Sequence, residues 1–379
     1  MAKNDNLTDF LQDIADTIRA KRGITGSISA QNFATEIAAI EGGGTPTPTP
    51  PTPDMPVIGD GKTYLYIKIA AEGRMTVPLY FSQTVANGVT IDWGDGSATQ
   101  TLSGTSKINT THTYTEIGEY TISLKPLSSC TLELGHNTSN YCVLGSTLNN
   151  GRVYSNMLQA VEIGMNVTSI GSYAFNRCYS LSSIVIPDGV TSIGAYAFDY
   201  CYSLSSIVIP DGVTSIGNYA FDYCYSLSSI VIPDSVTSIG TYAFGRCHSL
   251  SSIVIPDGVT SIGTYAFYYC YSLSSIVIPD GVISIGTYAF DTCSSLSSIV
   301  IPGGVSSIGN SAFSNCYGMA FYDFSMCSSI PTLGGSSVFS YIPSDCKIVV
   351  PDNLYDSWKA ATNWSRHASN MVKASQFNR

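Results

Sequence analysis

The sequence predicts a multidomain chain: a short N-terminal helical anchor, a small β-sandwich, and a solenoid of stacked 23-residue coils with a C-terminal cap. Three observations predict it. Cysteine recurs at a fixed step, a Gly/Thr/Pro stretch isolates the start of the chain, and strand-like segments fill the interval between them. A repeat of this length indicates coils that stack, because no single coil buries its own apolar face. The repeating cysteines are Cys178, Cys201, Cys224, Cys247, Cys270, Cys293 and Cys316.

The first element covers residues 1–41, where apolar side chains recur at helical spacing. Two helices this short bury too little apolar surface to be stable alone. We expect them to pack on copies of themselves or on a larger assembly, or else to form a self-contained hairpin on the next domain. Residues 42–56 are a linker, in which glycines provide a hinge and alternating prolines favour an extended spacer.

Residues 57–135 predict a β-sandwich. The segments 64–69, 89–93 and 120–124 are rich in β-branched and aromatic residues with partial alternation, and turn residues separate them. Trp93-Gly94-Asp95-Gly96-Ser97, followed by His112-Thr113-Tyr114, resembles the PKD-type immunoglobulin-like module. The resemblance implies a seven-stranded spacer or adhesion module without catalysis. Asp92 and Asp95 either contact a calcium ion, or Asp95 braces its own turn.

The solenoid is expected over residues 158–350, after a connector at 136–157, and the cap over 351–379. In one coil Leu181, Ile184 and Ile186 point inward from a short strand, and Gly194 permits a tight bend. The motif IPxxVxxIGxxAFxxCxxL, which starts at Ile186, recurs with little change and resembles the BspA-type leucine-rich repeat family. The resemblance implies a non-enzymatic fold, and members of that family are mostly surface or extracellular adhesion proteins.

The cysteines predict neither disulfides nor a metal site. Equivalent positions in stacked coils form a column with a spacing of about 4.8 Å, and a small buried thiol fits such a column. No CxxC pair or Cys/His cluster accompanies them. We therefore expect reduced thiols in the core, with no metal and no cofactor.

Composition excludes several classes of partner. The net charge is −10, and only Arg177 and Arg246 are basic between Leu158 and Ala320, so neither nucleic acid nor an anionic membrane surface is an expected partner. The sequence contains no apolar stretch of about 18 residues, so membrane insertion is not expected. The first residues show no secretory signal. The four histidines lie in different contexts without a nucleophile and an orienting acid, so no enzymatic activity is expected.

Variation among the coils gathers around the cysteine, at the two residues before it and the one after it. We expect these positions to face solvent, where tyrosines offer flat apolar area for a sugar ring or a protein surface. Alternatively, these positions are unconstrained and drifted after duplication. We expect the tyrosines of the Tyr-Ala-Phe sequence to be half-buried and to serve in packing. The candidate ligand-contact residues are Tyr200, Tyr202, Tyr223, Tyr225, Arg246, His248, Tyr269 and Tyr271.

The predicted function is adhesion. Residues 11–21 and 33–37 resemble the leading segment of phage tail-associated proteins, and the absence of an export signal fits a particle released by lysis. The main hypothesis is a phage tail or virion-surface protein, made in the host cytoplasm. Its N-terminus would dock to other virion proteins, in a homo-oligomer such as a trimer, and its coils would bind a bacterial surface glycan or protein. The alternatives are a bacterial cell-surface adhesin and a purely structural virion decoration or spacer.

Overall fold

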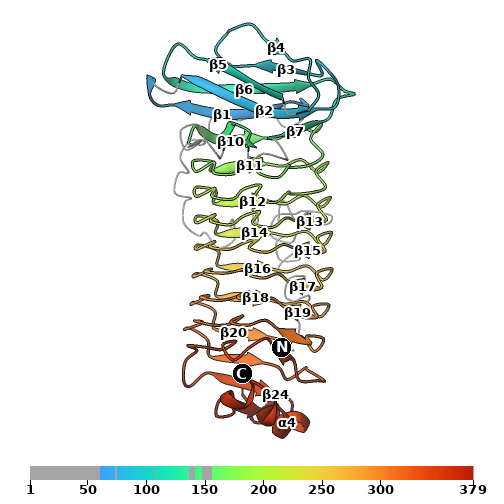
Figure 1. Ribbon diagram of the computed structural model, residues 1–379, viewed down its shortest axis with the longest axis vertical. Coiled ribbons are helices and arrows are strands. Elements are labelled where there is room, and N and C mark those ends of the chain that lie inside the picture. Colours follow the sequence, from blue (N-terminus) through green and yellow to red (C-terminus); the bar gives the residue numbers. More distant parts are fainter. Residues whose placement is uncertain (1–59, 73–74, 107, 136–140, 147–155, 379) are drawn as a thin grey trace, which may run out of the picture. The chain divides into compact units, whose positions relative to one another are not determined.

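The computed structural model describes residues 60–72, 75–106, 108–135, 141–146 and 156–378. The predicted helical anchor (1–41) and linker (42–56) lie outside the described residues. The chain divides into two units, Met1–Val57 and Ile58–Arg379, and the second unit is described below (Figure 1).

Two antiparallel sheets begin the second unit. β1 (Thr63–Ile69), β6 (Gly118–Pro126), β3 (Val89–Asp92) and β4 (Gln100–Thr101) form one of them in that order. β5 (Ile108–Thr113), β2 (Thr76–Gln83) and β7 (Leu132–Leu134) form the other. Buried side chains of both sheets share one core, because alternate residues of each strand point to the same side. The three segments predicted as strands become β1, β3 and β6. Their assignment to the PKD-type module stays a prediction.

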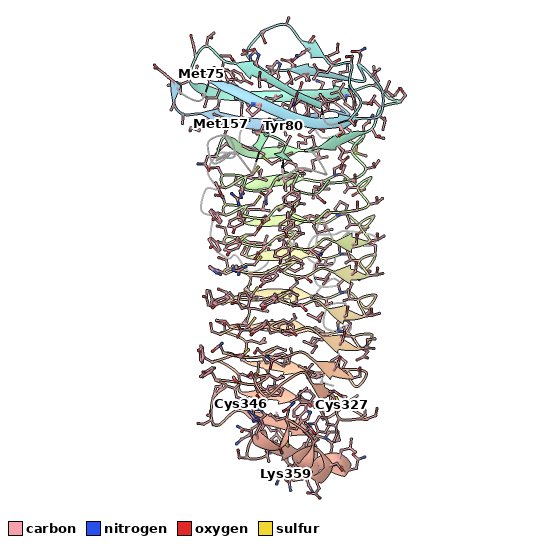
Figure 2. All side chains as sticks on the ribbon, in the orientation of Figure 1. Met75, Tyr80, Met157, Cys327, Cys346 and Lys359 are labelled. Carbon is pink, nitrogen blue, oxygen red and sulfur yellow. The ribbon has the colours of Figure 1, made fainter. Side chains whose placement is uncertain are left out.

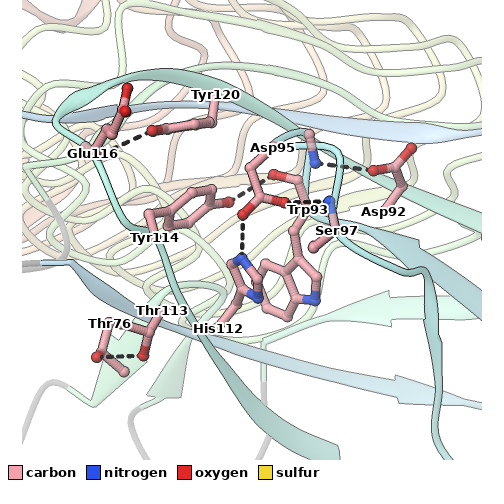
Figure 3. Close-up of polar contacts among 11 residues, drawn as sticks. Thr76, Asp92, Trp93, Asp95, Ser97, His112, Thr113, Tyr114, Glu116 and Tyr120 are labelled. Atoms are coloured by element: carbon pink, nitrogen blue, oxygen red, sulfur yellow. Dashed lines mark hydrogen bonds and ion pairs between the residues drawn. The ribbon is translucent and has the colours of Figure 1, made fainter.

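The turn after β3 is braced by its own side chains (Figure 3). Asp95 Oδ1 accepts a hydrogen bond from Ser97 N at 3.0 Å, and its Oδ2 lies 2.6 Å from His112 Nε2. Burial opposes ionisation of Asp95, but the hydrogen bonds from Ser97 and His112 outweigh it and lower its pKa to about 2. The His112 ring stacks on Trp93 with centroids 4.9 Å apart. These contacts support the interpretation of Asp95 as a turn brace and of His112 as a structural residue.

The first coil of the solenoid continues the sheet of the sandwich. β10 (Leu158–Glu162) pairs antiparallel with β1 on one side and parallel with β11 (Ser183–Val185) on the other. Additional backbone hydrogen bonds cross the joint, from Lys68 N to Met157 O and from Tyr80 N to Val143 O. Figure 2 labels Met157 and Tyr80 at this level. The sandwich therefore covers the strand edge that an unpaired first coil would leave open.

Successive coils stack in register through two columns of parallel strands (Figure 1). Ile207 lies opposite Ile230 in the first column, and Ile216 lies opposite Ile239 in the second. The first column continues through β12 (Ser206–Val208), β14 (Ser229–Val231), β16 (Ser252–Val254), β18 (Ser275–Val277), β20 (Ser298–Val300) and β22 (Phe321–Asp323). The second contains β13 (Ser215–Ile216), β15 (Ser238–Ile239), β17 (Ser261–Ile262), β19 (Ser284–Ile285), β21 (Ser307–Ile308) and β23 (Thr332–Leu333).

The interior of the coils is a set of identical columns. The Phe198 ring stacks on that of Phe221 with centroids 5.2 Å apart, and the phenylalanines of the other coils repeat this contact. Each cysteine thiol from Cys201 to Cys316 donates to the carbonyl of a phenylalanine in the preceding coil, as Cys224 Sγ does to Phe198 O at 3.2 Å. All described cysteines are free and buried. The solenoid predicted from the 23-residue step is thus confirmed.

The glycine that recurs at the Ile-Gly position of each coil has a different role from the one expected. A Cβ on Gly194 would lie 2.5 Å from Ser172 N, and one on Gly217 would lie 2.6 Å from Ala195 N. The glycine is therefore needed because the backbones of adjacent coils approach closely here, and not for a tight bend. The left-handed backbone falls on tyrosine instead, at φ 58° for Tyr196.

The last coils end in a mixed cap. β24 (Lys347–Val350) pairs with β22 and with β25 (Met371–Lys373). In the chain, α4 (Tyr355–Ala360) lies between β24 and β25. Short 3-10 turns occupy Asp352–Leu354, Ser365–His367 and Ala374–Gln376. Trp358 and Trp364 are fully buried and pack edge to face with centroids 5.3 Å apart. These indoles cover the apolar end that an open stack would expose; Lys359 of α4 and Cys346 before β24 are labelled in Figure 2.

Candidate binding face

Two residues of each coil adopt a left-handed backbone, and they direct side chains outward in columns. One is the tyrosine of the Tyr-Ala-Phe sequence, replaced by the buried Ser311 in the coil of Cys316, and the other is the residue just before the cysteine. We call these the Tyr-Ala-Phe column (Tyr173, Tyr196, Tyr219, Tyr242, Tyr265, Tyr288) and the pre-cysteine column (Arg177, Tyr200, Tyr223, Arg246, Tyr269, Thr292, Asn315). The residue after the cysteine forms the post-cysteine column (Tyr179, Tyr202, Tyr225, His248, Tyr271, Ser294, Tyr317).

Rings in the post-cysteine column stack along the solenoid. Tyr202 lies 4.9 Å from Tyr225 with nearly parallel planes, and His248 follows Tyr225 at 4.4 Å. Tyr271 continues the column at 4.7 Å from His248, with its ring tilted. Burial, with a smaller contribution from the positive charge of Arg246, lowers the pKa of His248.

The pre-cysteine column combines stacked rings with two cations, Arg177 and Arg246. Tyr200 and Tyr223 stack at 4.2 Å, and the Arg246 guanidinium lies 4.4 Å from the centroid of Tyr223. The guanidinium also lies within cation–π distance of Tyr242 and Tyr268. Arg246 is therefore held among three rings.

Edge-to-face contacts join the two columns. Tyr200 meets Tyr202 at 5.9 Å, Tyr223 meets Tyr225 at 5.8 Å and Tyr269 meets Tyr271 at 5.4 Å. The structure thus brings all eight predicted contact residues into one contiguous surface, which we call the aromatic face. Whether a ligand uses this face stays a prediction.

Stacking changes what the aromatic face can offer. The planes of Tyr202 and Tyr225 are only 4° apart, so each ring covers the flat side of its neighbour. The rings inside a column therefore present edges and hydroxyls to solvent, and not the flat apolar area expected from sequence. Flat ring surface is available only where a column is interrupted.

The second residue before the cysteine is buried in every coil but one, which corrects the sequence expectation; the exception is Tyr268, which is half-buried and lies against Arg246. Asn176, Asp199, Asp222 and Asp291 are each at most 5% exposed. Asp199 Oδ2 accepts a hydrogen bond from Asn176 Nδ2 at 2.9 Å. Sequence could not show this, because a polar residue in a turn usually faces water, whereas here the left-handed residues on either side turn this one inward.

The buried carboxyl groups of Asp199 and Asp222 lie beneath the aromatic face. Burial, with repulsion from Asp222, raises the pKa of Asp199 to about 8. Burial also raises the pKa of Asp222 to about 6, although Arg246 pulls it down. Asp199 Oδ1 has no hydrogen-bond partner among the described residues. The raised pKa keeps Asp199 largely protonated at neutral pH, because the neutral carboxyl group costs less to bury than the carboxylate.

The described residues lack two features, a metal-ion cluster and a membrane-spanning helix. Within the ranges given above, no group of three or more His, Cys, Asp or Glu side chains is arranged to hold a metal ion. In the same part of the chain, no helix has the length and apolar character required to cross a membrane. The arrangement can bind through rings, hydroxyls and two cations, Arg246 and Arg177, and the Arg177 guanidinium lies 5.4 Å from the centroid of Tyr200.

The repeated coil, its two strand columns and its capped end define a leucine-rich repeat solenoid. The family described as BspA type leucine rich repeat region matches residues 146–274 and 214–344, with six copies of the repeat. Together these ranges cover 146–344, just over half of the 379 residues. The chain belongs to the BspA-type leucine-rich repeat family, as the sequence motif predicted.

Solved structures of bacterial leucine-rich repeat proteins are similar to this chain. A protein from Bacteroides ovatus is 26% identical over 57% of this chain and 60% of its own, with a TM-score of 0.43. A Treponema protein (T. pallidum) is 27% identical over 54% and 88%, with a TM-score of 0.39. A leucine rich cell surface protein from Faecalibacterium prausnitzii is 27% identical over 66% and 83%, with a TM-score of 0.35. The chain thus spans about 60% of the length of the first of these. No curated protein matches the chain.

Proposed function

We propose that the protein is a non-enzymatic binding protein of a bacterial surface, and that its aromatic face contacts a surface glycan or protein. The observation that carries the proposal is the continuity of the face. Tyrosines, an arginine and a histidine from successive coils join through ring contacts into one surface. Tyrosine and arginine are enriched where proteins bind each other, and a repeated face sums several weak contacts by avidity.

Family membership supports a surface location. The BspA-type resemblance implies adhesion at bacterial surfaces, so the cell-surface adhesin is favoured over the virion protein as the main proposal. The virion hypothesis rests on residues 11–21 and 33–37, which lie outside the described residues. The trimer and the docking to other virion proteins depend on the same segment and stay predictions.

Binding of the full chain to bacterial cells and to their envelope fractions tests the proposal. The full chain is preferred because β10 pairs with β1, so a fragment that starts near residue 150 would leave the β10 edge open. We expect Tyr202→Ser combined with Tyr225→Ser to weaken binding, because it removes two adjacent rings of the aromatic face. The matched control is Val208→Ser with Val231→Ser, which changes the first strand column in the same coils.

The alternative of a purely structural spacer predicts a different result. A spacer with no ligand would bind no envelope fraction, and the tyrosine variant would behave like the valine control. Equal binding by both variants would therefore reject the aromatic face as the contact surface.

A further inference from the structure

The post-cysteine column is interrupted at a single coil. Every coil from Tyr179 to Tyr271 contributes a ring, Ser294 replaces the ring in the next coil, and Tyr317 restores it one coil later. Thr292 takes the place of a ring in the adjacent pre-cysteine column. The aromatic face therefore lacks two neighbouring rings at one level.

The rings beside this break are the most exposed of their column. Tyr271 is 38% exposed and Tyr317 is 59% exposed, whereas Tyr179, Tyr202 and Tyr225 are half-buried under their neighbours. No other ring lies against Tyr317 within the described part of the chain. Flat aromatic surface, hidden elsewhere in the column, is thus uncovered at this level.

The size of the break matches one ring. Adjacent coils are about 4.8 Å apart, so the backbone positions of Tyr271 and Tyr317 are separated by about 9–10 Å. A ring inserted midway lies about 4.8 Å from each position. The column's own rings pack at this distance, as Tyr202 and Tyr225 do at 4.9 Å.

The chemistry around the break is neutral and rich in hydroxyls. Ser294 Oγ donates to Tyr271 O at 3.4 Å, and Tyr317 donates its hydroxyl hydrogen to Asn315 Oδ1 at 2.9 Å. Lysine and arginine are absent between Arg246 and Lys347, so an acidic group on a ligand would find no cation here. Asp291, beneath the break, is buried and accepts a hydrogen bond from Asn315 Nδ2 at 2.9 Å.

We propose that the break between Tyr271 and Tyr317 is a subsite for one neutral pyranose ring of a glycan. The sugar's C–H faces pack on the two exposed tyrosines, and its rim of hydroxyls meets Thr292, Ser294 and Asn315. An aromatic side chain of a protein partner would fill the same thickness, but it would add no hydrogen bond to the hydroxyls of Thr292 and Ser294. The proposal deepens the proposed function and rests on it.

Filling the break is the decisive experiment. Saturation-transfer NMR on the full chain uses methyl pyranosides of glucose, galactose, mannose and N-acetylglucosamine, with p-cresol as an aromatic probe. We expect at least one pyranoside to bind, and Ser294→Tyr to weaken it by about tenfold or more. Because neighbouring coils carry tyrosine at this position, Ser294→Tyr fits the fold, and a thermal melt checks it. Ser294→Ala keeps the break open and should bind as the parent chain does, whereas Tyr317→Ser should lose binding.

Three outcomes overturn the subsite: no pyranoside binds, Ser294→Tyr binds unchanged, or p-cresol alone binds and indicates an aromatic side chain as occupant. Each leaves the proposed function standing, because that depends on the separate effect of the Tyr202 and Tyr225 changes on binding to cells. If Tyr202→Ser with Tyr225→Ser loses binding to cells while Ser294→Tyr keeps its pyranoside binding, the proposed function holds and the subsite is rejected.

Discussion

Arg246 and Asp222 lie one coil apart, and the arginine Nη1 donates to both carboxylate oxygens at 3.1 Å. The side chain of Asp222 is 4% exposed and that of Arg246 is 24% exposed. Tyr223 and Tyr242 lie against the guanidinium. The arginine therefore compensates a carboxylate that has almost no access to water, and it does so from a position on the aromatic face.

Arg246→Met should destabilise the solenoid, because it leaves Asp222 buried without its cation. Loss of one partner of a buried pair costs about 3–5 kcal/mol. Adding Asp222→Asn to this variant should recover most of the loss, because the neutral amide needs no counter-ion. Urea unfolding of the full chain at pH 7 measures both changes. A double variant as unstable as Arg246→Met would contradict the assignment of the cost to the carboxylate.

The contribution of Asp199 to the stability of the folded chain should fall as pH rises from about 4 to 8. Burial, with repulsion from Asp222, raises the pKa of Asp199 to about 8, above its ordinary value of 3.8. The folded state therefore binds a proton that the unfolded state has released, so the stabilisation is complete below pH 3.8 and is lost as pH passes 8. The slope from one such group is at most about 1.4 kcal/mol per pH unit.

Asp199→Asn isolates this contribution, because the amide does not titrate. We expect the variant to flatten the dependence of unfolding free energy on pH between about 4 and 8 and to be more stable than the parent chain at pH 9. Asp188→Asn, at an exposed turn position, is the matched control and should leave the slope as it is. An unchanged slope in Asp199→Asn would show that this carboxylate ionises freely in the folded chain.

Repetition made most of the solenoid predictable from sequence. The step of 23 residues sets the coil, and the apolar positions around Cys201 and Ile207 identify its interior. The second strand column was missed, because two-residue strands such as β13 form only when the next coil supplies their hydrogen bonds. The pairing of β10 with β1 was also missed, since strand order between distant segments is a tertiary property.

The sequence predicted which residues make up the candidate face but not how their side chains are arranged. The variable positions identified Tyr202 and Tyr225, yet their stacking, which hides the flat sides of the rings, depends on the distance between coils. The inward position of Asp199 depends on the left-handed backbone of Tyr196 and Tyr200, at φ 58° and 61°. Tyrosine is not a residue from which such a backbone is expected.

Gly217→Ala should destabilise the chain by about 1–3 kcal/mol, because the added Cβ forces apart two closely packed coils. It would lie 2.6 Å from both Ala195 N and the Gly194 carbonyl carbon, where no flexible side chain can yield. Gly189→Ala is the control, since the nearest atom to its Cβ is Met165 O at 3.6 Å. Thermal melts of the two variants compare them, and equal melting temperatures would argue against a tight contact at Gly217.

The cysteines of the coils should resist alkylation in the native protein and react fully in denaturant. Cys201 and Cys224 are completely buried, and burial raises the pKa of both thiols well above the ordinary value. The nucleophilic thiolate is therefore scarce and out of reach of the reagent. Mass spectrometry after iodoacetamide treatment counts the modified residues. Disulfides that persist in denaturant would contradict the free thiols of the structure.

Thr292→Asn should stabilise the solenoid by about 1 kcal/mol, because a β-branched residue is strained in the left-handed region and asparagine tolerates it. Thr292 has φ 64°, and Asn315 occupies the equivalent position one coil later at φ 57°. Thr214→Asn, at an exposed position outside the left-handed residues, is the control and should change stability by less than about 0.5 kcal/mol. Urea unfolding midpoints compare the variants. A lower midpoint for Thr292→Asn would mean that the threonine makes contacts worth more than the strain of its backbone.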